Sequence, residues 1–111
     1  MKFESELEKG NFITSECKYC KKIVWPPSEL CNSCFKETSW RHANREGVII
    51  EFSKQDDVYF CLVEFENAMK LIGKISKGIP SAGDKVMLDK CGIKNSNHYY
   101  EMSLISQANS V

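Results

Sequence analysis

The chain has 111 residues, of which 42% are apolar and 27% are charged, and its 15 basic residues are balanced by 15 acidic ones. This composition is that of a folded globular protein and excludes a disordered or fibrous chain, while the length limits any division to two small modules. The even charge gives no global attraction to nucleic acid or an anionic membrane, and no apolar run approaches the ~20 residues that a membrane-spanning helix needs.

The first predicted element is a short amphipathic helix within residues 1–12. Phe3 and Leu7 stand four residues apart among Glu and Lys residues, and Gly10 is a natural helix C-cap. Because charged residues alternate with isolated apolar ones, the segment lacks the apolar core of an export signal. We therefore expect a cytoplasmic protein that makes no contact with a membrane.

Residues 13–45 contain four cysteines in two pairs of identical spacing, Cys17 with Cys20 and Cys31 with Cys34. A two-residue gap allows both sulfurs of a turn to reach one ion, and two such turns supply the four thiolates of a tetrahedral site. Without an export signal, metal binding is favoured over disulfide formation. The sequence thus predicts a zinc ribbon with structural zinc, since a four-sulfur site leaves no position for water or substrate.

The chain between these cysteine pairs is predicted to be a loop held by the metal. Hydrophobic periodicity is absent from residues 17–34, and Pro26 and Pro27 exclude a helix or a central strand there. Tetrahedral coordination by four sulfurs also suits iron, so a rubredoxin-like electron carrier stays open as an alternative.

Residues 46–107 have the short apolar or alternating runs that are typical of strands in a small barrel. Five strands are predicted, at 48–52, 58–65, 69–75, 85–91 and 98–105. Turn-forming residues separate them at 54–57, 66–67, 77–84 and 92–97.

The pattern of apolar residues also predicts how deeply two of these strands are buried. Residues 58–63 are consecutively apolar, which predicts burial on both faces, whereas residues 98–104 mix polar and apolar positions like a half-exposed strand. Cys61 lies within the apolar strand and Cys91 ends another, so both are interpreted as structural thiols without a redox role.

Several of these features together resemble a known family. They are Phe3, Leu7, Gly10, the two cysteine pairs, Pro26, Pro27, Gly47 at the start of a strand, and the Gly-Asp-Lys-Val stretch at 83–86. The family is the acyl-CoA-associated OB-fold family, filed as domain of unknown function thirty-five, and the resemblance runs over about residues 3–105. It implies a mainly β fold with a short N-terminal helix (1–12), a rubredoxin-like zinc ribbon (13–45) and a five-stranded OB-fold barrel (46–107).

The sequence departs from the family pattern after each cysteine pair. Where glycine is usual, this chain has Lys21 after Cys20 and Phe35 after Cys34. Without glycine, these two turns are expected to have a strained backbone geometry. The loop at 53–57 is also shorter than is usual for the family.

The resemblance implies a non-catalytic partner of thiolase-superfamily enzymes. Archaeal relatives bridge acetoacetyl-CoA thiolase and hydroxymethylglutaryl-CoA synthase, and bacterial relatives accompany lipid-transfer-type thiolases or aldolases. By position, the four paired cysteines match the metal ligands of the family. The function implied is that of a scaffold in a thiolase-type complex that helps to hold CoA thioesters, with CoA as a shared ligand.

Residues 17–45 carry six basic side chains against two acidic ones, which makes this stretch a candidate surface for the phosphates of CoA. Tryptophan side chains there can stack on adenine or anchor a partner protein, although packing of the ribbon on the barrel is the competing role. The candidate CoA-binding or partner-binding residues are Lys22, Trp25, Trp40, Arg41 and Arg45.

Local signatures of catalysis are missing from the sequence. It has no glycine-rich phosphate loop, serine nucleophile elbow or helical His-Glu-x-x-His motif, and His42 and His98 lack a matching nucleophile or carboxylate. We therefore expect no enzyme activity. A protein that binds single-stranded nucleic acid is a further alternative, since OB barrels often do so, but the even net charge argues against nucleic acid as a partner.

Overall fold

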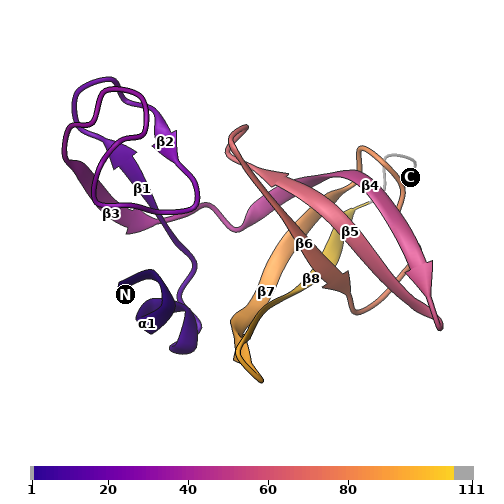
Figure 1. The fold of residues 1–111 in the computed structure, drawn as a ribbon. Helices are drawn as coiled ribbons and strands as arrows, with labels where there is room; N and C mark the ends of the chain where they lie inside the picture. Colours follow the sequence, from indigo (N-terminus) through magenta and orange to yellow (C-terminus); the bar gives the residue numbers. More distant parts are fainter. Residues whose placement is uncertain (1, 107–111) are drawn as a thin grey trace.

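A computed structural model describes residues 2–106 and arranges them as one helix, a small sheet and a closed barrel (Figure 1). The helix α1 spans Lys2–Glu8, and the sheet contains β1 (Ile13–Cys17), β2 (Ile23–Val24) and β3 (Thr38–His42). The barrel contains β4 (Glu46–Gln55), β5 (Val58–Phe65), β6 (Met69–Ile75), β7 (Lys85–Lys94) and β8 (Asn97–Ser106). The predicted mainly β fold, with its helix, ribbon and five-stranded barrel, is confirmed.

Two predicted segment ends, residues 1 and 107, lie outside the described residues. Within the described part of the chain, no helix is long and apolar enough to cross a membrane.

Helix α1 is terminated at Gly10, as the sequence predicts. The Gly10 N–H donates to the Leu7 carbonyl at 2.9 Å and the Asn11 N–H donates to the Glu6 carbonyl at 2.9 Å, which is the pair of bonds of a Schellman cap. The φ angle of Gly10 is 85°, a conformation that is relaxed only for glycine. The helix buries Phe3 and Leu7, so its apolar face is fixed against the rest of the molecule.

The small sheet has β1 in the middle, paired antiparallel with β2 on one side and β3 on the other. The sequence predicts only a loop between residues 17 and 34, and this is wrong at Ile23–Val24, which pair with β1. A strand forms there because Val24 is buried against Cys17 and Cys31, so the same small core holds the strand and the cysteines. After Trp25 come Pro26 and Pro27, which end the pairing.

The barrel strands lie in the order β4-β5-β6-β8-β7, and pairing of β4 with β7 closes the ring. All neighbours are antiparallel except β6 and β8, which are parallel. The predicted turn at 92–97 is too long, because β7 continues to Lys94 and only Asn95 and Ser96 turn the chain. Gly92 stays in the strand opposite Tyr99, whose ring fills the space that a Cβ would need.

Strand β5 alternates between the core and the surface, so the prediction that residues 58–63 are buried on both faces is wrong. Cys61 and Val63 are buried, whereas Phe60 and Leu62 are half-buried on the outer face. In Figure 1, no helix or sheet of the described residues covers that face. The predicted half-exposed character of residues 98–104 is confirmed.

One hydrophobic core runs from α1 and the sheet into the barrel. Phe12 lies at the junction, with its ring centroid 5.2 Å from that of Phe65 and 6.2 Å from that of Tyr100 in the barrel. On the other side, its centroid lies 6.0 Å from the ring of Trp25. The division into segments at residue 45 stays a prediction, and the hydrophobic core continues across it.

Candidate metal centre

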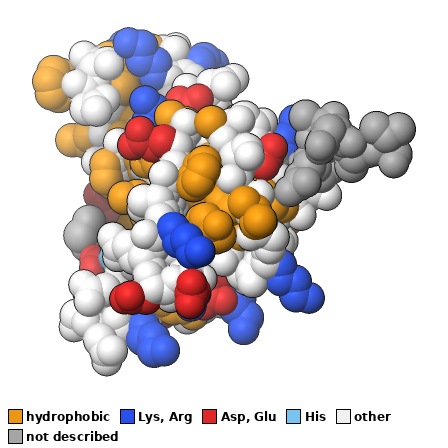
Figure 2. All heavy atoms as spheres, turned by 90° about the vertical axis from the view of Figure 1, so that its right-hand side faces the viewer, with side chains coloured by type: hydrophobic (Ala, Val, Ile, Leu, Met, Phe, Trp, Pro, Cys, Tyr) orange, Lys and Arg blue, Asp and Glu red, His pale blue; other side chains and the backbone are white. Residues whose placement is uncertain are grey.

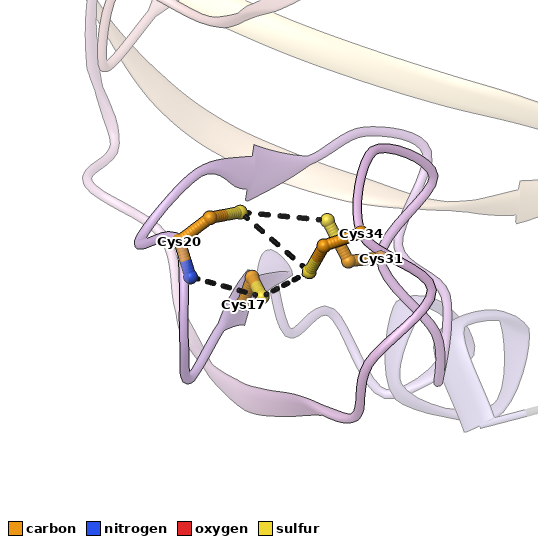
Figure 3. A group of neighbouring side chains, drawn as sticks. All are labelled: Cys17, Cys20, Cys31 and Cys34. Carbon is orange, nitrogen blue, oxygen red and sulfur yellow. Dashed lines mark hydrogen bonds between the residues drawn. The ribbon is translucent and has the colours of Figure 1, made fainter.

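The four paired cysteines converge in the ribbon, with their sulfur atoms pointing toward one another (Figure 3). The Sγ of Cys17 lies 3.4 Å from the Sγ of Cys34, and the Sγ of Cys20 lies 3.7 Å from the Sγ of Cys31. All four sulfurs lie within 4.8 Å of one another, and the six cysteines of the chain are free of disulfides.

These separations suit one metal ion. Four sulfurs placed about 2.3 Å from a central zinc at tetrahedral angles stand roughly 3.8 Å apart, whereas the sulfurs of a disulfide are about 2.05 Å apart. The observed contacts at 3.4 to 4.0 Å match the first arrangement. The cluster could therefore hold a metal ion and is compatible with zinc, and the assignment of the four cysteines as ligands stays a prediction.

Each cysteine pair forms the same turn. The Lys21 N–H donates to the Cys17 carbonyl at 3.1 Å, and the Phe35 N–H donates to the Cys31 carbonyl at 2.9 Å. Both donors have left-handed backbone conformations, with φ angles of 65° at Lys21 and 62° at Phe35. The strained geometry that the sequence predicts for these non-glycine positions is confirmed.

Backbone N–H groups within the turns lower the pKa values of two of the cysteine thiols. The N–H of Cys20, assisted by that of Tyr19, lowers the pKa of the Cys17 thiol to about 6. The N–H groups of Cys34 and Ser33 lower the pKa of Cys31 in the same way.

The pKa of Cys34 shifts in the opposite direction. The N–H of Lys36 acts to lower its pKa, but hydrogen bonding with the neighbouring thiols, first that of Cys17, and burial outweigh it and raise the pKa to about 11. Metal binding by the cluster must therefore release protons, since the ligands are thiolates.

The two arginines of the candidate ligand-binding set have internal partners. Arg41 donates from both terminal nitrogens to the carboxylate of Glu66, at 2.6 and 3.0 Å, and from Nε to Glu16 at 3.2 Å. Arg45 donates to the Gly10 carbonyl at 2.9 Å and to a β7 carbonyl at 3.2 Å. Both guanidinium groups thus join the ribbon or the helix to the barrel.

The two tryptophans pack in different ways. Trp25 lies against the main core, with edge contacts from its ring to Phe3 at 5.6 Å and to Phe12 at 6.0 Å between centroids. Trp40 is also partly buried, and the ammonium of Lys2 lies 5.4 Å from its ring centroid. Both tryptophans therefore have the packing role that competes with adenine stacking, Trp25 through the larger set of ring contacts.

Lys22 is exposed, and its Nζ lies 3.4 Å from the hydroxyl of Ser33. Whether Lys22, Trp25, Trp40, Arg41 or Arg45 contacts CoA or a partner stays a prediction. Of these five, Lys22 has the least committed side chain, because both tryptophans pack against the core and both arginines bond within the fold.

The remaining cysteines and histidines have structural surroundings. Burial raises the pKa of the Cys61 thiol to about 11, and burial also raises the pKa of Cys91. The imidazole of His98 makes an edge contact with Phe3 at 5.7 Å between centroids, and His42 is exposed. The surroundings of Cys61 and Cys91 agree with the structural roles expected from the sequence.

A groove on the outer face of the barrel was not predicted. It consists of two adjoining hollows of about 330 and 510 Å³ that share Phe60 and Ile72, and we call it the barrel groove. The smaller hollow extends over Leu62 to Glu51, while the larger one is lined by cationic and aromatic residues. These are Lys74, Lys90, Lys94, His98 and Tyr99, with Glu101 beside them.

The three lysines of the barrel groove have no ion-pair partner among residues 2–106, although Glu101 lies opposite both Lys74 and Lys90 in strand register. The alternation of Lys70, Ile72 and Lys74 marks the outer face of β6 in the sequence. The sequence could not show that β7 and β8 add their lysines to it, because that depends on barrel closure.

Figure 2 shows the face of the molecule that lies on the right in Figure 1. On this side of the barrel, hydrophobic side chains gather at the surface among single charged ones. Exposed apolar residues of the barrel include Val48, Ile50, Phe52 and Ile72.

Comparison with known proteins identifies the fold. No family model matches the sequence, and no curated protein matches it. Among solved structures, one described as an Ltp2-ChsH2(DUF35) aldolase matches with a TM-score of 0.74 and 15% identity, over 94% of this chain and 92% of that one. A DUF35 family protein of unknown function from Sulfolobus solfataricus matches with a TM-score of 0.66 and 22% identity, over 93% of this chain and 80% of that one. The family resemblance seen in the sequence is thus supported by the fold.

Proposed function

We propose that this chain, which has the fold of DUF35 proteins, is a cytoplasmic, zinc-binding accessory subunit. It would bind a thiolase-superfamily enzyme, such as a thiolase or a hydroxymethylglutaryl-CoA synthase. One observation carries the proposal. The fold matches over nearly the whole chain, ribbon and barrel together, with a protein whose description joins DUF35 to an aldolase. The contribution of this subunit would be to position and shield CoA thioesters, while the partner makes and breaks bonds.

A non-catalytic role is supported by how the reactive side chains are used. Four thiolates around one ion leave no open position for water or substrate. The Cys61 thiol, with a pKa of about 11, is a poor nucleophile at neutral pH. Purified chain that turns over a CoA thioester unaided would contradict this part of the proposal.

The metal of the ribbon is proposed to be zinc with a structural role, in a rubredoxin-like arrangement. Iron is the competing metal, because tetrahedral sulfur coordination suits both. Elemental analysis tests this choice. A colourless protein with one zinc per chain would support zinc, whereas a red, redox-active protein would support the electron carrier.

The barrel groove is the part of the chain that we propose for CoA. Its larger hollow, of about 510 Å³, is within the usual range of ligand sites. Lys74, Lys90 and Lys94 offer unpaired cations for phosphates, whereas Arg41 and Arg45 of the originally expected set are engaged elsewhere. The smaller hollow, with Leu62 and Ile72, would accept an uncharged chain.

The same lysines and aromatic rings favour single-stranded nucleic acid as a second candidate ligand. A nucleic-acid backbone that continued along the groove would meet Glu51 and apolar side chains instead of further cations. Oligonucleotide binding that weakens steeply with salt would favour this candidate, and no binding even at low salt would remove it.

The experiment that tests the proposal is affinity capture from native lysate, followed by titration with CoA. We expect recovery of a thiolase-superfamily enzyme, and CoA affinity that falls at least tenfold when Lys74, Lys90 and Lys94 are all replaced by Gln. A matched control replaces Lys9, Lys54 and Lys85, which lie outside the groove lining. Repeated recovery of no such enzyme, from well-expressed protein, would overturn the partnership.

A further inference from the structure

The turns of the two cysteine pairs carry an apolar and cationic surface of their own. We call it the knuckle surface and define it by Tyr19, Leu30 and Phe35 with Lys18, Lys21, Lys22 and Lys36. The three apolar side chains are strongly exposed, Tyr19 at 62%, Leu30 at 55% and Phe35 at 76%. Single exposed apolar residues are ordinary on a protein surface, but three strongly exposed ones in the two short cysteine-containing segments favour an interaction surface on this part of the ribbon.

Phe35 is the most informative member. Its backbone lies in the left-handed region at a φ of 62°, where glycine is the relaxed choice. Its phenyl ring makes no ring contact with any of the described residues and lies largely in solvent. A phenylalanine at position 35 is therefore unfavourable for the folded state in two ways, through backbone strain and through exposure of its ring. Neither the core nor the cysteine cluster explains its presence.

Positive charge predominates in the segments around this ring. Four lysines belong to the two turns, against the carboxylates of Glu29 and Glu37, and Glu37 pairs with Lys18 at 3.4 Å. Lys36 lies 4.6 Å from the ring centroid of Tyr19, and Lys21 has no ion-pair partner among residues 2–106. The surface thus combines exposed apolar side chains with a surplus of positive charge.

A protein fits this combination better than a nucleic acid does. Lys36 covers one face of the Tyr19 ring, which reduces its use for base stacking. Leu30 offers no stacking face at all. An apolar recess edged by carboxylates would bury Phe35 and Leu30 and neutralise the lysines at its rim.

We propose that the knuckle surface is a docking site for a protein that presents an apolar recess edged by Asp and Glu, with Phe35 as the anchor. The inference rests on the proposed function in one respect, because it takes the thiolase-superfamily enzyme as this partner. It places the contact on the ribbon, apart from the barrel groove.

Photocrosslinking within cells separates the two proposals. A benzophenone amino acid is placed at position 35 of the full chain, or at position 72 in the barrel groove as the matched comparison, and crosslinked peptides are sequenced. We expect position 35 to crosslink to an acidic segment of a thiolase-superfamily enzyme. Crosslinks to that enzyme from position 72 alone would overturn the docking site and leave the proposed function standing.

The other outcomes are equally decisive. Crosslinks from position 35 to an acidic segment of an unrelated protein would support the docking surface and overturn the proposed partner. Crosslinks from position 35 to nucleic acid, or none from either position, would overturn the docking site.

Phe35→Gly then tests the anchor in the purified, zinc-loaded protein. Because glycine relaxes the left-handed backbone, we expect unchanged zinc content and a melting temperature that does not fall, together with at least a tenfold loss of affinity for the crosslinked enzyme. Lys21→Gly is the matched control, since it relaxes the equivalent turn and keeps the phenyl ring. Equal affinity of Phe35→Gly and the unmodified protein would overturn the proposal.

Discussion

Arg41 of the ribbon and Glu66 of the barrel form a two-pronged ion pair, with nitrogen-to-oxygen distances of 2.6 and 3.0 Å. Glu66 lies in the turn between β5 and β6, and its carboxylate also accepts the Asn44 N–H at 2.8 Å. Three donors therefore meet one carboxylate where the linker enters the barrel. The pair is 25 residues apart in sequence and fixes how β3 approaches the barrel.

Glu66→Gln is expected to lower the free energy of unfolding by about 1–2 kcal/mol. Charge-assisted hydrogen bonds contribute more to the free energy of unfolding than neutral ones do. Because the Arg41 side chain is 37% exposed, solvent screening reduces this contribution. Urea denaturation measures the change. Glu64→Gln is the matched control, since Glu64 makes no ion pair among the described residues, and an equal loss in both variants would contradict the role of the pair.

The same pair predicts how stability depends on pH. Hydrogen bonds from Arg41 hold the pKa of Glu66 below its ordinary value of 4.5 in the folded protein. A lowered folded-state pKa contributes stability above the unfolded pKa, and that contribution is lost as the pH falls through the folded pKa. The difference in unfolding free energy between the unmodified protein and Glu66→Gln should be constant from pH 7 to about pH 5 and shrink at lower pH. A difference that grows on acidification would contradict the assignment.

Loss of a ribbon thiolate is expected to abolish tight metal binding. Cys34→Ser should lower zinc affinity on the order of a hundredfold or more, because it leaves three sulfurs in a site built for four. Competition with a chromogenic chelator measures the affinity. Cys61→Ala should keep one zinc per chain, since Cys61 is buried in the barrel core away from the cluster. Equal zinc retention by both variants would contradict the four-cysteine site.

Gly47→Ala should destabilise the barrel by about 1–3 kcal/mol through overpacking. A Cβ at this position would lie 2.6 Å from the Cγ1 of Val63 and 2.8 Å from the Cε1 of Phe65, and both side chains are fully buried. Val63→Ala makes room for the added methyl group. In a double-mutant cycle measured by denaturant unfolding, the combined variant should be less destabilised than the sum of the two single changes. Strict additivity would contradict the steric explanation.

The barrel was predictable from the sequence because its strands obey the alternation of a sheet with one buried face. Residues Met69–Ile75 alternate strictly between buried and exposed positions. The ribbon strands were not predicted as strands, since β1 buries the polar residues Thr14 and Ser15, which gives no apolar alternation. The cysteine spacing predicted the cluster without them, because the geometry of a metal site constrains the chain locally.

Long-range partners were beyond sequence reasoning. Arg41 and Arg45 were interpreted as ligand-binding residues because they lie in a basic stretch, but their acceptors come from distant segments, including Glu66 and Gly10. A charge count cannot show which cations already have internal partners. The lysines of the barrel groove were missed for the converse reason, since only strand register brings β6, β7 and β8 together.

The position of Phe12 has a consequence for how the chain can be divided. Its ring touches Phe65 and Tyr100 on one side and Trp25 on the other, so a fragment that begins at residue 46 would leave two large barrel rings facing water. Calorimetry of the intact chain should give a single endotherm, and chelation should shift the whole of it to lower temperature. The ion that the N-terminal cysteines hold would then set the heat tolerance of a barrel that it never touches.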